Sequence, residues 1–210
     1  GSEFSADKYL ERFFDYEFGL STIDVVKYMD ILGNSNTIHL NMCAVVKLYN
    51  FQMREVWKYH DCVNKAIAML KKVISNNIYS SERSLEFYIT WFLPVVVGLR
   101  FHNETSYREF IDGKGFKYYE TFFNLRLKSK DDYFKDLLTQ NEIYDDRNGY
   151  ILNGIKHISL EEKIRQVYVA MFEYTTDSKQ IQFGRILVNR EIREEFRKIC
   201  NGISYLADYK

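Results

Sequence analysis

The fold class is decided by residues 53–74, which read MREVWKYHDCVNKAIAMLKKVI. Apolar side chains recur there every three or four residues, which is the period of one face of an α-helix. That face would carry Val56, Tyr59, Val63, Ala66, Ile67 and Leu70. The pattern predicts a long amphipathic helix with one face buried against the rest of the molecule.

The segments on either side indicate that most of the chain is helical. Residues 88–101 form an apolar run of 14 residues that contains Pro94 and Gly98. This run is too short to span a bilayer, and it predicts a buried, kinked helix. The chain has 1 proline in 210 residues, which favours long helices with short connections. We therefore expect a mainly all-α fold, a multi-helix array or bundle with at most one short N-terminal strand.

The remaining elements follow from periodicity and capping residues. Residues 14–18 alternate apolar and acidic side chains, which predicts a short strand. Residues 145–149 are rich in Asp, Asn and Gly and predict a loop. Ser80 and Ser81 are expected to cap the helix that contains Trp91. Further helices are predicted at residues 7–13, 23–31, 38–49, 105–111, 117–127, 131–144, 160–174 and 182–205.

The composition excludes several classes of function. The chain has 29 basic and 29 acidic residues, so its net charge of zero provides no global attraction to nucleic acid or anionic membrane. No GxxxxGK[ST] phosphate loop, GxGxxG motif or GxSxG elbow occurs in the sequence. The acidic pairs at residues 131–132 and 145–146 fall at predicted turns, where solvated or capping carboxylates are expected. We therefore predict that the chain by itself is not a complete enzyme.

Histidine and cysteine positions predict neither a metal site nor a disulfide. The four histidines do not stand at metal-ligand spacing with cysteine or carboxylates; they are His39, His60, His102 and His157. Cys43, Cys62 and Cys200 are widely spaced and include no CxxC pair. They are expected to be buried thiols in a reducing compartment, which predicts a cytoplasmic protein.

One spacing indicates a nuclease as an alternative. Arg54 and His60 are separated by five residues, and this arrangement resembles the Arg-x(4–6)-His signature of HEPN ribonucleases. The resemblance implies that the pair polarises a ribose 2′-OH and stabilises the phosphate. The chain departs from the signature at Glu55, where HEPN domains usually have a short polar residue.

A second resemblance, to the KAP family of P-loop NTPases, covers roughly residues 7–75. Residues 9–20, YLERFFDYEFGL, are similar to the segment that leaves the last core helix of that family and enters a core strand. Residues 51–56, FQMREV, resemble the element that begins a lid helix. The chain departs from the family at Ser21 and Thr22, where a proline commonly follows the strand. Residues 76–210 resemble no family that we can name.

The KAP resemblance implies a division of the chain. Residues 1–4, GSEF, have the sequence that paired cloning sites encode, and no Met precedes Ser5, so we expect a piece of a longer protein. Residues 5–20 would be the edge of the NTPase core, residues 21–78 a helical lid, and residues 79–210 a further helical region. The Walker motifs, ATP and Mg²⁺ would belong to the upstream NTPase core. Bacterial members of the family are associated with phage exclusion and defence.

Two arginines would matter most in a KAP-like protein. Arg12 is the candidate arginine finger, and Arg54 is the candidate residue that senses the nucleotide. A guanidinium suits both roles because it stays charged and binds phosphate oxygens bidentately. The alternative for each is a surface arginine paired with a nearby carboxylate.

The expected partners are the upstream NTPase core and a protein, either another protein or a second copy of the chain. If residues 14–18 lose their neighbouring strands, we expect this segment to pack as helix or to pair between copies. Arg190, Arg193 and Arg197 share a helical face interleaved with glutamates, and Glu194 can pair with Lys198. This face is predicted to be a solvated, salt-bridged surface, and the alternative is a surface for nucleic acid or an acidic partner. The aromatic residues Phe116, Tyr118, Tyr119, Phe122 and Phe123 are expected in the core rather than in a partner groove.

Overall fold

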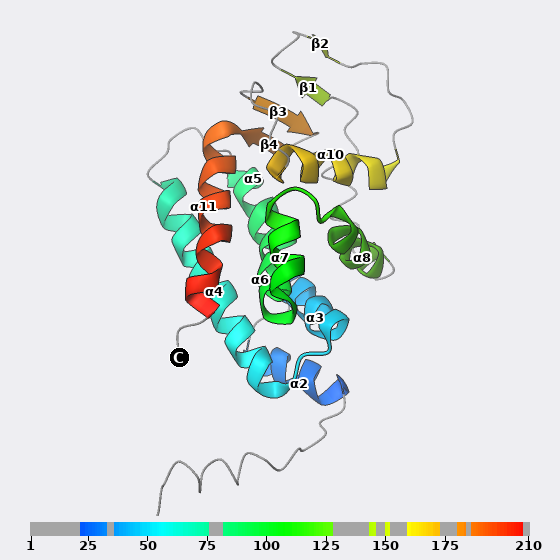
Figure 1. Ribbon diagram of the computed structural model, residues 1–210, viewed down its shortest axis with the longest axis vertical. Coiled ribbons are helices and arrows are strands. Elements are labelled where there is room, and N and C mark those ends of the chain that lie inside the picture. The colour runs from blue at the N-terminus through cyan, green and yellow to red at the C-terminus, as the bar shows by residue number, and fades with distance from the viewer. Residues whose placement is uncertain are drawn as a thin grey trace, which may run out of the picture.

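The computed structural model is a predominantly helical array, which confirms the predicted fold class (Figure 1). It describes residues 22–32, 36–75, 82–127, 143–145, 150–151, 159–172, 180–183 and 186–207. The predicted helix at 7–13, the predicted strand at 14–18 and Arg12 lie outside these residues. The described helices are α2 (Thr22–Leu32), α3 (Thr37–Tyr49), α4 (Met53–Ser75), α5 (Glu82–Phe87), the π-helical η1 (Tyr88–Phe92), α6 (Leu93–His102), α7 (Glu104–Ile111), α8 (Phe116–Leu127), α10 (Leu160–Phe172) and α11 (Arg190–Ala207).

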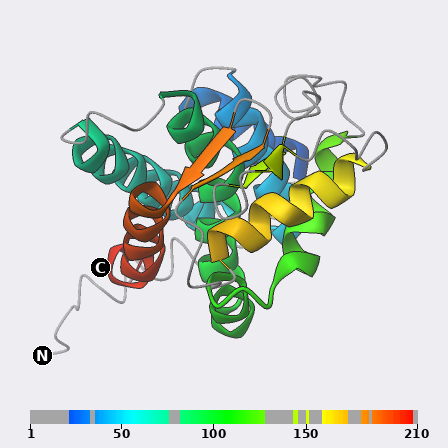
Figure 2. The ribbon, with the colours of Figure 1, turned by 90° about the horizontal axis from the view of Figure 1, so that it is seen from above.

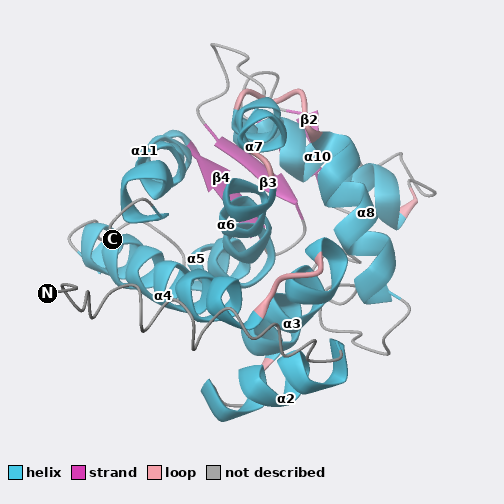
Figure 3. Ribbon diagram, turned by 60° about the horizontal axis from the view of Figure 1, so that its bottom comes forward, coloured by secondary structure: helices cyan, strands magenta, loops and turns pink. Residues whose placement is uncertain are grey.

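The centre of the array is α6, as the apolar run at 88–101 predicted. Residues 93–99 of this helix are all buried, and α6 packs against α3, α4, α7 and α11 (Figure 3). A Cβ placed on Gly98 would lie 2.2 Å from Val45 Cγ1, so α3 and α6 approach closely there because this residue has no side chain. Burial on all sides explains why this helix shows no polar face in the sequence.

The prediction of a kinked helix rested on Pro94 and Gly98, and the structure has a turn of π-helix, η1, directly before α6. Pro94 has no N–H, and in a regular α-helix its ring would clash with the carbonyl of Thr90, four residues earlier. The backbone widens instead, and Leu93 N donates to Tyr88 O. The freed carbonyl of Thr90 accepts a hydrogen bond of 2.7 Å from Asn41 Nδ2 of α3. The proline therefore creates an acceptor in the core, and a side chain from another helix satisfies it.

The predicted amphipathic helix is α4. Val56, Tyr59, Val63, Ala66 and Leu70 are fully buried, and the helix packs against α6 and α11. The buried hydroxyl of Tyr59 donates to Pro94 O at 3.1 Å, which joins α4 to the start of α6. The buried apolar residues from α2 to α11 form one hydrophobic cluster. The predicted lid (21–78) and the predicted further helical region (79–210) therefore contribute residues to the same core.

The described C-terminal part contains a β-sheet that was not predicted from the sequence. Strands β1 (Ile143–Asp145), β2 (Tyr150–Ile151), β3 (Gln180–Phe183) and β4 (Ile186–Asn189) form an antiparallel sheet of order β2-β1-β3-β4. The sheet lies at the end of the molecule opposite α2, and β4 contacts α5, α10 and α11 (Figures 1 and 2). The expectation of at most one short, N-terminal strand was therefore wrong in this detail.

The predicted helix at 182–205 was wrong at residues 182–183 and 186–189, which belong to β3 and β4, and α11 begins only at Arg190. The alternation of polar and apolar residues in QIQF, followed by the short run ILVN, forms a hairpin in which Ile181 pairs with Val188. Gly184 and Arg185 connect the two runs, and a two-residue link with glycine is typical of hairpins. The predicted helix at 131–144 was also wrong at its end, where Ile143 and Tyr144 belong to β1.

The aromatic residues of α8 lie in the core, as predicted. Tyr119, Phe122 and Phe123 are buried, while Phe116 and Tyr118 are partly buried against the same cluster. The rings of Tyr119 and Phe92 stack with centroids 4.5 Å apart. Stacked and edge-to-face pairs of this kind add to the stability gained from burial alone.

Helix α11 completes the core from the far end of the chain. It packs along α4 and α6, with Phe196 and Ile203 fully buried. Hydrogen bonds join it to α7 and α6: Tyr107 Oη donates to Cys200 O, and Arg100 Nε donates to Ser204 Oγ at 3.2 Å.

Candidate functional site

Arg54 is exposed in the first turn of α4, and no carboxylate among the described residues forms an ion pair with it. Its neighbour Glu55 is engaged elsewhere, because Glu55 Oε2 accepts a hydrogen bond of 2.8 Å from Gln52 N just before the helix. Trp57 lies one turn further along the same face and leaves 54% of its surface exposed. An arginine and a tryptophan thus stand side by side on the surface.

The second member of the HEPN-like pair, His60, lies on the same helix. Arg54 and His60 are six positions apart in the sequence, which is about 9 Å along a helix axis and about 240° around it. The structure therefore turns Arg54 and His60 toward different sides of α4. His60 is half-buried, and its ring nitrogens lie 3.2 and 3.4 Å from Asn64 Nδ2. Burial, followed by the charge of His39, lowers the pKa of His60.

Three side chains with metal-ligating atoms converge where α2 meets α3. Asp30 comes from the last turn of α2, His39 from the first turn of α3, and Cys43 from the next turn of α3. His39 Nε2 lies 2.9 Å from Asp30 Oδ1 and 3.5 Å from Cys43 Sγ, and all three atoms lie within 4.8 Å of one another. We call these residues the Asp30–His39–Cys43 cluster.

Local structure explains why the cluster forms. Asn36 begins α3, and its side chain accepts a hydrogen bond of 2.9 Å from His39 N, which fixes the first turn of the helix. Val25 and Met29 are buried and form the inner face of α2. Asp30, the next residue, is thereby left at the edge of that face with its side chain 57% exposed.

The geometry excludes a Cys-His-Asp catalytic triad. In a triad the nucleophile and the carboxylate contact different nitrogens of the imidazole. One nitrogen takes the proton of the nucleophile, and the carboxylate stabilises the resulting imidazolium through the other nitrogen. Here both Asp30 and Cys43 approach Nε2, and a single ring nitrogen cannot donate to one while accepting from the other. Burial and the charge of Asp30 also raise the pKa of the Cys43 thiol to about 11, which opposes its use as a nucleophile.

The cluster was not predicted from the sequence, where we expected no metal site. The prediction that no histidine stands at ligand spacing with a cysteine was wrong for His39 and Cys43, which lie four residues apart on one helical face. Asp30 carried no comparable signal, because its position depends on how α2 packs against α3.

Comparison with protein-family models, with curated proteins and with solved structures found no match.

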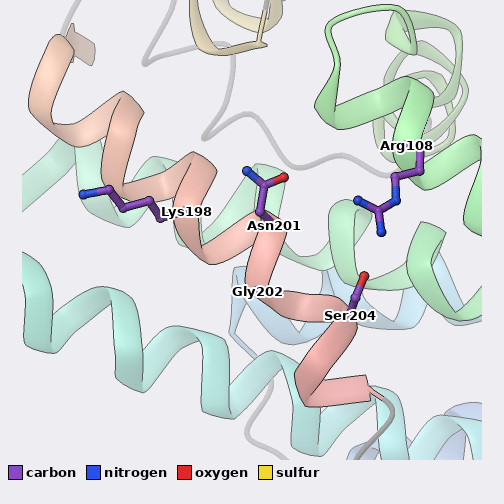
Figure 4. A pocket seen from close by; sticks show the side chains of 5 residues that line it. All are labelled: Arg108, Lys198, Asn201, Gly202 and Ser204. Carbon is purple, nitrogen blue, oxygen red and sulfur yellow. The ribbon is translucent and has the colours of Figure 1, made fainter.

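A shallow hollow of about 450 Å³ lies between α7 and α11, lined by Arg108, Lys198, Asn201, Gly202 and Ser204 (Figure 4). Its two cations are already paired with carboxylates. Arg108 Nε lies 2.7 Å from Glu104 Oε1, and Lys198 Nζ lies 2.6 Å from Glu195 Oε1. The hollow is therefore a weak candidate for binding an anion.

The arginine face predicted on α11 is divided between surface and core. Arg190 is exposed and pairs with Glu194, whereas Arg193 is buried and donates to Ala170 O at 3.4 Å. Lys198 pairs with Glu195 rather than with Glu194 as expected. A salt-bridged surface is confirmed, but Arg193 is not part of it.

Across the described ranges, no helix is both long and apolar enough to cross a bilayer.

The three cysteines are buried and free, as predicted. Burial is the main cause that raises the pKa of each thiol, to about 11 for Cys43, to about 12 for Cys62, and upward also for Cys200. At pH 8 a thiol of pKa 11 is ionised in about one molecule in a thousand, and only the thiolate reacts.

We expect the native, chelator-treated protein to show almost no reaction with Ellman's reagent over minutes. In denaturant all three thiols should react at once. Rapid modification of one cysteine in the native protein would contradict this.

Proposed function

We propose that this chain is the helical lid and interaction module of a KAP-like P-loop NTPase, possessing no catalytic activity of its own, and that it serves in a bacterial defence or phage-exclusion system. The proposal starts from the resemblance of residues 9–20 and 51–56 to that family. One structural observation supports it: Arg54 is exposed at the start of the long helix α4, and no described carboxylate pairs with it.

The surroundings of Arg54 favour contact with a partner. A surface arginine usually has a nearby carboxylate available, but the adjacent one, Glu55, caps the helix through Gln52 N. The guanidinium remains available for the phosphate oxygens of a nucleotide held by the upstream NTPase core. Trp57, exposed on the same face, adds a large apolar surface, and tryptophan and arginine are enriched where proteins bind each other tightly. In this proposal α4 presents both residues to the NTPase core.

The isolated chain should neither bind nor hydrolyse ATP. It has no Walker loop to hold the triphosphate and Mg²⁺, and a single arginine cannot replace that loop. Titration calorimetry with Mg-ATP is expected to show no binding in the micromolar range. Micromolar binding would overturn the proposed division of labour between lid and core.

The same preparation tests the HEPN-like alternative, which predicts metal-independent cleavage of RNA. We expect no such activity, because Arg54 and His60 point to different sides of α4. A robust ribonuclease activity that disappears in His60→Ala and persists in Asn64→Ala would replace the NTPase proposal with the nuclease.

A further inference from the structure

We propose that Asp30, His39 and Cys43 bind a divalent transition-metal ion of the Zn²⁺ class, which ties the end of α2 to the start of α3. The inference rests on the convergence of three different donor atoms and is independent of the proposed NTPase role.

The separations from His39 Nε2 to its two neighbours suit a tetrahedral ion. With ordinary zinc–ligand lengths, a tetrahedral centre places nitrogen and sulfur about 3.5 Å apart, and nitrogen and oxygen about 3.4 Å apart. The observed separation of His39 Nε2 and Cys43 Sγ is 3.5 Å. Asp30 Oδ1 lies 2.9 Å from Nε2, so it would have to move about 0.5 Å farther away. The Asp30 side chain is more than half exposed, so it has room for this shift.

The donor set selects the class of metal. An imidazole nitrogen and a thiolate sulfur favour zinc or its chemical neighbours over Mg²⁺ and Ca²⁺, which prefer oxygen ligands. Three protein ligands leave a fourth position, which water fills in zinc sites of this type. The ion would also neutralise the charges of the carboxylate and the thiolate, and its binding would release the proton that the thiol otherwise keeps.

The alternative is a hydrogen bond between Asp30 and His39 beside a neutral thiol. In that arrangement Nε2 can direct its hydrogen at only one neighbour, although both Oδ1 and Sγ face it. A bound cation would make use of all three atoms at once. The two arrangements differ in a measurable way, since only the metal site contains a thiolate.

The test is titration of the untagged, chelator-treated protein with Co²⁺ and then Zn²⁺. We expect one Co²⁺ per chain, a thiolate-to-cobalt charge-transfer band, intense visible bands from tetrahedral geometry, and loss of all of them when Zn²⁺ displaces the cobalt. Zinc at a hundredfold excess over its Kd should raise the unfolding midpoint by about 5–10 °C.

Variants assign the signal to the cluster. Cys43→Ser should abolish the charge-transfer band, and Asp30→Ala should weaken binding at least tenfold. Asp30→Ala alters an exposed side chain, so it keeps the test valid even if Cys43→Ser fails to fold. The matched controls are Cys62→Ser, another buried thiol, and Asp61→Ala, another surface carboxylate, and both should bind as the parent does. Absence of the band in the parent protein, or unchanged binding in Asp30→Ala, would overturn the proposal.

Discussion

Replacing Asn41 with leucine is expected to lower the free energy of unfolding by about 3–5 kcal/mol. Asn41 is fully buried, and both ends of its amide are used. Nδ2 donates to Thr90 O, while Oδ1 accepts from Arg126 Nε, a cation that is itself buried. Leucine has a similar size but neither polar atom. It would leave the Thr90 carbonyl without this donor and would remove one acceptor from a buried guanidinium, and each loss costs about 1–3 kcal/mol.

Urea unfolding followed by circular dichroism measures this loss. Asn64→Leu, on the exposed face of α4, is the matched control and should change stability by no more than about 0.5 kcal/mol. A double-mutant cycle with Pro94→Ala gives a sharper test, because alanine restores an N–H that can bond to Thr90 O. In that background Asn41→Leu should cost clearly less. A loss below 1 kcal/mol in the parent background would show that the amide does not hold the π-turn.

Under the proposed function, in which an NTPase core precedes this chain, Arg54→Ala should reduce the ATP hydrolysis of the joined protein about a hundredfold. This is the usual effect of removing one donor that stabilises charge in a transition state. Arg54→Lys should recover only part of the activity, because an ammonium cannot bind two phosphate oxygens as a planar guanidinium does. The fall should appear in kcat, with ATP binding little changed.

The control for this prediction is Arg190→Ala, which removes an exposed arginine from the first turn of α11. It should leave hydrolysis unchanged. Thermal unfolding should be the same for both variants, since neither side chain is buried. Full activity in Arg54→Ala would remove Arg54 from the nucleotide-sensing role and leave α4 only as a docking surface.

The sequence predicted the helices well wherever a periodic pattern extended over three turns or more. Helix α4 is the clearest case, because its buried stripe repeats regularly from Val56 to Leu70. The helix centred on α6 was found from apolar content alone, since it is buried on all sides. The π-helical turn before α6 could not be predicted, because Pro94 indicates a break in the helix but not the way in which the backbone accommodates it.

The prediction failed where the elements are short. The four residues of β3 and the four of β4 are too few to separate a strand period from a helix period, and they directly precede a strongly amphipathic helix. The Asp30–His39–Cys43 cluster shows a different limit. Two of its members could be paired by spacing on α3, but the third reaches them only through the packing of α2.

The docking of α11 has a consequence for how the chain folds during synthesis. Its bond from Tyr107 to Cys200 spans 93 residues, and its bond from Arg100 to Ser204 spans 104. Contacts so distant along the chain form slowly, because a long loop must close before they bring any gain. On the ribosome, the apolar surface of α4 and α6 that α11 covers would stay exposed until residues 190–207 emerge from the exit tunnel. During that interval the nascent chain is most exposed to aggregation and to capture by chaperones.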